Sequence, residues 1–330
     1  MKRGCLLFTF LLAGHLGVAH ADHEALKPDD FPTRPIEMVV VYPAGGGMDI
    51  TARTLARETE KLLPVGIVVV NRTGGAGLVG HTYLATQAEK DGYTIAMLGN
   101  PWLFTDILLR EAPFDHTAFR PINSLTFEPL YWVVNSDSFL ADMSFEEIIE
   151  YAKEHPGELR TGVMPDNNFE WLNDLIQNTF DVEFAYVPFE SGGAMMPSIL
   201  GGHIDLAAVY LGEFGQYYEA GQIKPVFQAS QSPYPLLPEP PTMEQVGVPF
   251  LGPSWGAWRM VMVPEGTPED RVAYLEAAFM HALSQQETLD AFMENHLLVE
   301  PIPGDEAQRM YTEGFDAMRQ FFVDTGRISE

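Results

Sequence analysis

Two kinds of apolar pattern alternate along this chain. Short runs of apolar and β-branched residues at positions 38–41, 66–70 and 93–98 have the composition of buried strands. Between them, residues 49–63 and 78–88 carry apolar side chains at the three- and four-residue spacing of a helix. Strands that alternate with helices predict an α/β protein with a parallel sheet, whose loops gather at the carboxyl edge of the strands.

The same alternation continues through the second half of the chain. Further strands are predicted at residues 131–135, 160–164, 183–187, 204–210 and 258–263, and further helices at 145–155, 170–180, 194–200, 268–284, 287–295 and 305–325. Residues 231–241 are rich in proline and serine and are predicted to form an extended connector, and residues 22–35 a loosely held lead-in. Two halves of similar rhythm indicate two α/β lobes, with the chain crossing between them.

Three glycine-containing loops follow strands of the first half, at residues 43–47, 71–77 and 99–102. The first loop holds consecutive glycines, and Asp49 behind it is predicted to cap the next helix. Such a turn directs backbone N–H groups into one small volume at the positive end of the helix dipole, which suits an anion. The alternative is an ordinary turn whose glycines only allow tight packing. The convergence of three such loops at one sheet edge favours the anion site.

The N-terminus has the pattern of a secretory signal peptide. Lys2 and Arg3 precede an apolar stretch that runs to about residue 18, and residues 19–21 (Ala-His-Ala) form a small-x-small cleavage site. We expect residues 1–21 to be removed by cleavage before Asp22. A transmembrane helix is disfavoured because the apolar stretch is short and polar residues follow it.

Charge and cysteine content narrow the possible partners. The formal net charge of −27 argues against nucleic acid and anionic membrane surfaces, because both require a basic patch. The only cysteine, Cys5, lies in the predicted signal peptide, so no disulfide or thiolate site is expected after cleavage. The length of 330 residues predicts about two domains.

Catalytic and metal-binding patterns are weak in this sequence. Residues 75–80 match the dinucleotide-binding pattern G-x-G-x-x-G. They do not follow their strand closely, however, and the acidic residue that this pattern requires at the end of the next strand falls in a turn. A dinucleotide site is therefore disfavoured. The histidines lack metal-ligand spacing and are predicted to lie at the surface or in loops, with His81 nearest the glycine loops. We therefore expect binding rather than catalysis, with no metal and no cofactor.

An ordered series of motifs resembles one family of binding proteins. The motifs are PAGGGMD at residues 43–49, VVVNRTGGAG at 68–77, DGYT at 91–94, VPF at 187–189, LGGHID at 200–205, GE at 212–213, AGQI at 220–223, PPT at 240–242, WR at 258–259 and PEGTP at 264–268. Together they resemble the exported solute-binding proteins of tripartite tricarboxylate transporters, the TctC or Bug family. The resemblance extends over nearly the whole chain after the predicted signal peptide.

This resemblance implies a two-lobed Venus-flytrap fold with a ligand cleft between the lobes. Lobe I would comprise residues 22–126 and 250–330, and lobe II residues 127–249. Family members hold a ligand carboxylate mainly through backbone N–H groups and waters at two loops of the first lobe, and loops of the other lobe cover it. The residues of this chain that match are Tyr42, Pro43, Ala44, Gly45, Gly47, Met48, Asp49, Gly75, Ala76, Gly77, Leu78, Asn100, Met164, Asn168, Gly192, Gly193 and Tyr210.

The implied function is capture of a small carboxylate and its delivery to a membrane transporter. The ligand would be a di- or tricarboxylate, or an aromatic or amino-acid-type acid, and the partners would be the large and small membrane subunits. We expect a periplasmic monomer. A periplasmic sensor that passes the ligand to a signalling receptor, and an exported hydrolase, are the alternatives.

Three positions depart from the family's pattern. Met48 stands where threonine or serine is common, Glu190 stands where lysine is common, and residues 165–168 replace a run that is usually rich in glycine and serine. A tricarboxylate such as citrate would therefore meet fewer positive groups in this chain than in a typical member of the family.

Overall fold

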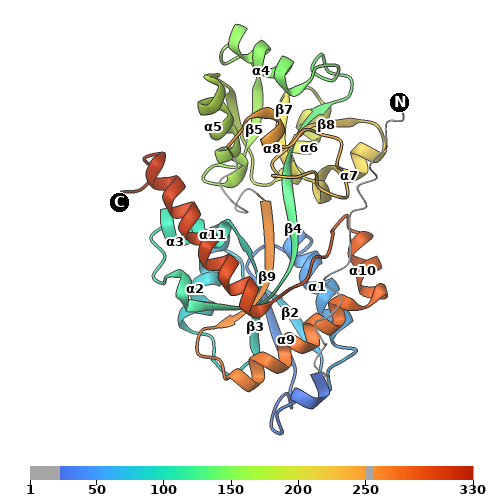
Figure 1. Cartoon of the computed structure of the whole chain (residues 1–330), viewed down its shortest axis with the longest axis vertical. Coiled ribbons are helices and arrows are strands. Elements are labelled where there is room, and N and C mark those ends of the chain that lie inside the picture. The colour runs from blue at the N-terminus through green and yellow to red at the C-terminus, as the bar shows by residue number, and fades with distance from the viewer. Residues whose placement is uncertain (1–22, 250–255, 330) are drawn as a thin grey trace, which may run out of the picture.

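The computed structural model describes residues 23–249 and 256–329. Two α/β lobes lie one above the other, joined by long strands (Figure 1). The predicted signal peptide and its cleavage site fall outside the described residues. Within the described part of the chain, no helix is long and apolar enough to cross a membrane.

The first lobe, at the bottom of Figure 1, is built on a mixed sheet in the order β2-β1-β3-β9-β4. β1 is parallel to β2 and β3, whereas β9 is antiparallel to β3 and β4. Its elements are η1 (His23–Leu26), β1 (Ile36–Val40), α1 (Gly47–Thr59), β2 (Ile67–Asn71), η2 (Gly75–Gly77), α2 (Leu78–Thr86), β3 (Thr94–Asn100), α3 (Trp102–Leu109), η3 (His116–Ala118), β9 (Gly256–Pro264), α9 (Glu269–Ser284), α10 (Gln286–Met293), β10 (Ile302–Pro303) and α11 (Gly304–Asp324).

The second lobe has its own sheet, with β5 parallel to β6 and β7. β7 and β8 both pair antiparallel with β4. The elements are α4 (Phe145–Glu154), β5 (Arg160–Val163), α5 (Asn168–Phe180), β6 (Ala185–Pro188), α6 (Gly192–Leu200), β7 (Leu206–Tyr210), α7 (Leu211–Glu219), β8 (Ile223–Gln228) and α8 (Met243–Val246).

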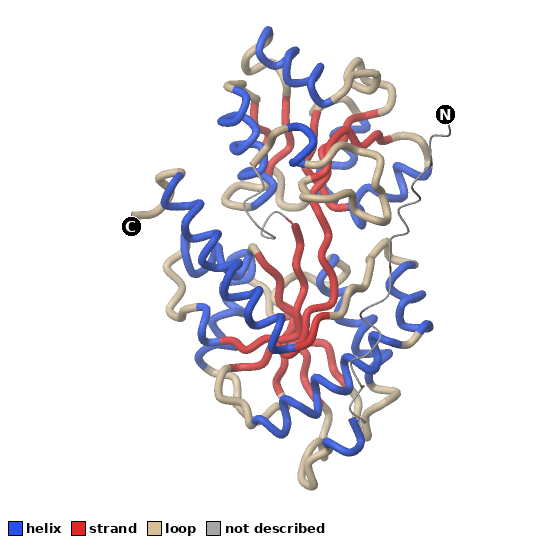
Figure 2. The backbone as a smooth tube through the Cα atoms, in the orientation of Figure 1, coloured by secondary structure: helices blue, strands red, loops and turns tan. Residues whose placement is uncertain are grey.

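Strand β4 (Phe119–Asn135) belongs to both sheets and runs from one lobe into the other (Figure 2). Its first part, as far as Pro129, pairs with β9. From Leu130 onward it pairs with β7 instead, and from Tyr131 with β8. A continuous strand therefore passes through the junction of the two lobes. The register of its pairing with β9 shifts between Pro121 and Asn123 and between Ser124 and Thr126, and that with β8 shifts between Trp132 and Val133.

Several predicted boundaries are wrong. β4 begins at Phe119, well before the predicted start at residue 131, because Pro121 and Pro129 interrupt the apolar pattern although both lie within the strand. β3 extends to Asn100 and α3 follows at once, so the third predicted loop is nearly absent from the described chain. Helix α7 and strand β8 were not predicted, since their apolar spacing is irregular.

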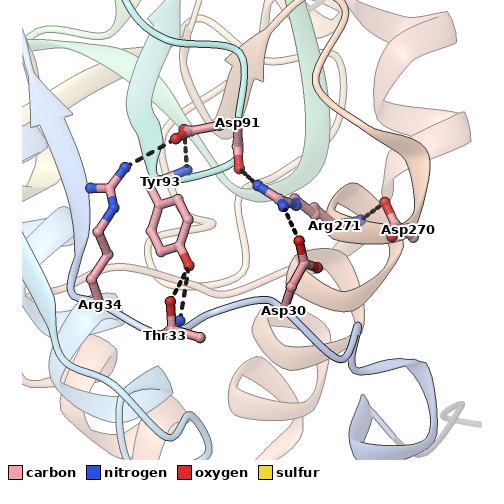
Figure 3. Close-up of polar contacts among 7 residues, drawn as sticks. All are labelled: Asp30, Thr33, Arg34, Asp91, Tyr93, Asp270 and Arg271. Carbon is pink, nitrogen blue, oxygen red and sulfur yellow. Dashed lines mark hydrogen bonds and ion pairs between the residues drawn. The ribbon is translucent and has the colours of Figure 1, made fainter.

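The predicted lead-in is held firmly by the first lobe rather than loosely. Phe31 is 1% exposed, and the N–H of Thr33 donates to the hydroxyl of Tyr93 at 2.9 Å. Arg34 pairs with Asp91 at 3.0 Å, and Asp30 pairs with Arg271 at 2.9 Å (Figure 3). Buried aromatic packing and ion pairs therefore fix this segment, although its sequence is polar.

Candidate functional site

The first glycine loop joins β1 to α1 and ends in the first turn of that helix. Gly45 has a positive φ of 83°, and its N–H donates to Oδ2 of Asp49 at 2.9 Å. Asp49 also accepts hydrogen bonds from Arg53 and Asn71, both at 2.9 Å. Burial alone would raise the pKa of Asp49, but these hydrogen bonds lower it below its usual value. Asp49 therefore fixes the shape of the loop.

Helix α1 begins at Gly47, two residues before the predicted start, and its N-cap is Gly46 rather than Asp49. Asp49 lies in the first turn, where its carboxylate reaches back to the loop, so it cannot act as the N-cap. Within the described chain no side chain caps this helix. The N–H groups of Gly47 and Met48 therefore remain at the positive end of the helix dipole, as an anion site requires.

A buried ion pair lies directly beside this first turn. A Cβ atom at Gly47 would lie 3.3 Å from Nη2 of Arg259. Arg259 on β9 is 4% exposed and donates to Oε2 of Glu128 on β4 at 2.9 Å. The other carboxylate oxygen of Glu128 accepts the N–H of Gly212, from the second lobe, at 2.9 Å. The Arg259–Glu128 pair thus places the first glycine loop beside β9 and β4, the strands at the junction of the two lobes.

The second glycine loop packs against the first. Gly74, Gly75, Ala76 and Gly77 all have positive φ angles, between 52° and 135°. A Cβ at Gly77 would lie 3.2 Å from the hydroxyl of Tyr42, so the two predicted loops are in close contact. Like α1, helix α2 receives no side-chain cap within the described chain.

Gly80 explains the G-x-G-x-x-G spacing. A Cβ at this position would lie 2.5 Å from Cγ1 of Val41 and 2.6 Å from the carbonyl oxygen of Arg72. The third glycine therefore allows α2 to pack closely on the strand before it. This is a packing role, which the third glycine also has in dinucleotide-binding turns.

Trp102, the last residue of the third predicted loop, connects the two lobes. Its ring lies edge-to-face against Tyr42 of the first lobe, with centroids 5.8 Å apart, and against Tyr210 of the second lobe, at 6.1 Å. Its indole N–H donates to Oδ1 of Asn167 at 3.3 Å. Trp102 was not among the predicted site residues, although the loop that contains it was expected at the same sheet edge as the two glycine loops.

The second lobe contributes residues at the carboxyl ends of its strands. The side-chain amide of Asn168, at the start of α5, donates to the Tyr210 hydroxyl at 2.7 Å. The backbone N–H of Tyr210 donates to Oε2 of Glu213 at 3.0 Å. Gly192 lies so close to Glu213 that a Cβ there would be 2.2 Å from Oε2. Burial, opposed by the Tyr210 N–H and reinforced by Glu128, raises the pKa of Glu213 to about 7.

His81 and His23 correct the prediction that the histidines lie at the surface or in loops. His81 is 0% exposed, and its Nδ1 lies 2.6 Å from Oδ2 of Asp106, which also accepts from Arg110. His23 is 6% exposed and packs edge-on against His281. The partner of each histidine lies far along the sequence, so local spacing could not reveal the burial.

Several buried polar atoms around these loops have no hydrogen-bond partner within the described protein. They are the Tyr42 hydroxyl, Nε2 of His81, both amide atoms of Asn100, Oδ1 of Asn168 and Nε of Arg259. Buried polar groups in native proteins are nearly always hydrogen-bonded, to protein or to water. These atoms are therefore available to bind waters or a polar ligand.

The predicted residues differ in how open they are to solvent. Exposed positions are Pro43, Ala44, Gly45, Gly47, Gly75, Ala76 and Gly193; half-buried positions are Tyr42, Leu78 and Met164; buried positions are Met48, Asp49, Gly77, Asn100, Asn168, Gly192 and Tyr210. The two loops of the first lobe contact each other through Gly77 and Tyr42. Through Trp102 they also contact Asn167 and Tyr210 of the second lobe. The side chains of Arg259, Glu128, Trp102 and Glu213 were missed.

Among the described residues, no metal cluster coincides with these loops. The described residues include no group of three or more His, Cys, Asp or Glu side chains that could hold a metal ion. A hollow of about 640 Å³ lies elsewhere, between α5 and the C-terminal part of α11.

Two α/β lobes joined by long strands, with uncapped helix N-termini directed at their junction, define the class of two-lobed solute-binding proteins. The sequence model of the tripartite tricarboxylate transporter family receptor, TctC, matches residues 51–313. The chain belongs to this family of periplasmic binding proteins, which are not enzymes.

Individual relatives agree with this assignment. Protein BugT of Bordetella pertussis is 27% identical over 272 residues, which cover 81% of this chain and 82% of BugT. A TctC solute-binding protein from Polaromonas, solved without ligand, is 27% identical with a TM-score of 0.72, over 88% of this chain and 99% of that one. An R. palustris protein solved with adipate is 26% identical with a TM-score of 0.77, and the match covers 90% of this chain and 98% of that one.

Proposed function

We propose that this protein is exported, captures a small carboxylate between its lobes, and delivers it to the large and small membrane subunits of a tripartite transporter. The observation that carries the proposal is the uncapped first turn of α1 beside the buried guanidinium of Arg259. Family membership and a similar protein solved with adipate support a carboxylate as the ligand.

The proposed mechanism begins with the carboxylate on the first lobe. The N–H groups of Gly47 and Met48 donate to it, and each such charge-assisted bond contributes about 1.5–3 kcal/mol. The second lobe then rotates over the ligand, and the closed form engages the membrane subunits. After the costs of association, several such bonds are compatible with micromolar affinity, about −8 kcal/mol.

The pairing of β4 supports the proposed lobes, residues 22–126 with 250–330 and residues 127–249. The partners of this strand change from β9 to β7 at Pro129 and Leu130, close to the proposed boundary. We also propose cleavage of the signal peptide before Asp22; N-terminal sequencing of the exported protein would test that position.

A carboxylate panel tests the function. Mono-, di- and tricarboxylates are titrated into the purified protein by calorimetry, with thermal shift as a second measurement. We expect at least one to bind at micromolar concentration. A panel in which no carboxylate binds or shifts the melting temperature would contradict the proposal.

The variant Gly47→Val tests the site. The new side chain projects toward the Arg259 guanidinium, so we expect affinity to fall at least tenfold while the lobe stays folded. Gly66→Val is the matched control, because it lies before β2, at the opposite edge of the sheet, where the nearest atom is 3.6 Å away in the flexible Glu60 side chain. Equal binding by Gly47→Val and the parent protein would refute the assignment.

A further inference from the structure

The second lobe has no positive side chain to offer a second carboxylate. Residues 127–249 contain only Lys153, Arg160 and Lys224 as lysines and arginines. Lys153 pairs with Glu150, Arg160 with Asp205 at 2.7 Å, and Lys224 donates to a backbone carbonyl. Lys153 and Arg160 lie before and at the beginning of β5, and Lys224 lies near the beginning of β8. Tyr210 lies instead at the end of β7, and Asn168 follows the end of the parallel strand β5. These cations are therefore at the edge of the sheet remote from the site.

Hydrogen-bond acceptors also lie at the site edge of this lobe. The N-termini of α5, α6 and α7 lie there too, but the Ser191 side chain caps α6 and the Glu213 carboxylate accepts the N-cap N–H of α7. Oδ1 of Asn168 has no partner within the described protein, although the residue is 0% exposed. The amide nitrogen of the same side chain is bonded to Tyr210, and the backbone N–H of Tyr210 is bonded to Glu213. Burial raises the pKa of Tyr210, an effect that the Asn168 hydrogen bond opposes and that the charges of Glu128 and Glu213 reinforce. An unpaired oxygen and two carboxylates thus surround Tyr210.

The acidic side chains around Tyr210 outnumber the basic ones. Arg259 is the guanidinium that faces Tyr210, Glu128 and Glu213, and it is already bonded to Glu128. It also lies against Gly47, where the ligand carboxylate is proposed to bind. Glu213 is half-buried, accepts the Tyr210 N–H and has no cation of its own among the described residues, so a positive group that binds beside it would stabilise its charged form.

Aromatic rings complete the surroundings. The ring planes of Tyr42 and Trp102 are inclined at 72°, and those of Trp102 and Tyr210 at 79°. A cation over the open face of one of these rings would be attracted by the negative charge of its π-system, whereas the positive edge of a ring would not attract it.

We propose that the ligand carries an ammonium group besides its carboxylate, and that this group binds the second lobe between Glu213, the free oxygen of Asn168 and the rings of Tyr210 and Trp102. The inference rests on the proposed function, because it places the ligand carboxylate at Gly47. It distinguishes this chain from the similar protein solved with adipate, which has a carboxylate at each end.

Matched ligand pairs test the proposal on the unmodified protein. Succinate is compared with 3-aminopropanoate, glutarate with 4-aminobutanoate, and adipate with 5-aminopentanoate, each by calorimetry; the pairs differ only in the exchange of one carboxylate for an ammonium group. The 2-amino acids of the same chain lengths are included. We expect an ammonium acid to bind at least tenfold more tightly than its dicarboxylate partner.

Two results would overturn the inference. A dicarboxylate that binds as tightly as its ammonium partner, or more tightly, refutes the ammonium site while leaving the proposed function intact. If no ligand of either kind binds, nor any other carboxylate, the proposed function fails and the inference falls with it.

The variant Glu213→Gln assigns the site to a residue. Gln keeps an acceptor for the Tyr210 N–H but removes the charge, so we expect affinity for the ammonium acid to fall at least tenfold and affinity for the dicarboxylate to stay equal or rise. Glu154→Gln, an exposed position at the end of α4, makes the same change of charge and should alter neither. An unchanged ratio between the two ligand classes in Glu213→Gln would refute the role of Glu213.

Discussion

The buried pair of Arg259 and Glu128 provides the sharpest test of the energetics at the lobe junction. Arg259 is 4% exposed and Glu128 is 1% exposed, and they join β9 to β4 where both strands leave the first lobe. Removing one partner of such a pair leaves an uncompensated buried charge, which costs about 3–5 kcal/mol. Removing both in favour of apolar side chains of similar volume is often neutral.

We therefore expect Arg259→Met to be much less stable than Arg259→Met/Glu128→Met. At about 2–4 °C per kcal/mol, the single variant should melt roughly 6–20 °C below the parent. The double variant should recover most of that difference, because the Gly212 N–H released by Glu128 belongs to an exposed residue and can bond to water. Thermal and urea denaturation of the parent, both single variants and the double variant form the cycle that isolates the coupling.

The result that would refute this reasoning is a double variant no more stable than Arg259→Met. That outcome would mean that the carboxylate of Glu128 does not depend on Arg259. Carboxylate titration of the double variant separates stability from function: the fold should recover, whereas affinity for the ligand carboxylate should remain low.

Glu213, Gly80 and Trp102 each allow a further test. The folded-state pKa of Glu213, about 7, lies above the ordinary 4.5, so the folded state binds the extra proton and stability is lost as pH rises through this interval. Glu213→Gln should match the parent at about pH 4, below both pKa values, and exceed it by about 1–2 kcal/mol at about pH 8 in paired denaturation curves, since partial exposure reduces the full effect. Gly80→Ala should destabilise the first lobe by about 1–3 kcal/mol through overpacking against Val41, and a melting temperature equal to the parent's would contradict the close approach. Trp102→Ala should weaken ligand binding at least tenfold and diminish the fluorescence change on closure, whereas a change that persists in full would show that Trp102 does not report closure.

Much of the fold could be predicted because its signals are local. The apolar runs of β1 and β2, the glycines after them and the helical spacing of α1 and α2 fall within a few residues of one another, and the structure confirms the alternation. Asp49 was misplaced as a cap because Asp is favourable both before a helix and in its first turn. Only the contact with Gly45 decides between these positions.

The parts of the site that were missed depend on contacts between distant residues. Arg259 and Glu128 stand 131 positions apart, and Trp102 meets Asn167 across 65. A charged residue within an apolar strand, as Arg259 is within β9, is the one local signal that could have marked the pair, because an isolated buried charge is unstable. The burial of His81 likewise depends on Asp106, which belongs to a helix that was not predicted.

The fastening of the lead-in has a practical consequence for experiments on this protein. Arg271 and Tyr93 hold residues 30–33 to the end of the first lobe that lies farthest from the second lobe (Figure 1, Figure 3). A fluorophore or surface anchor joined to the chain ahead of His23 would therefore be attached to one rigid body. A second fluorophore on the surface of the other lobe, for example near the end of α4, would then report the distance between two bodies, and the swing of a loose tail would not blur its signal.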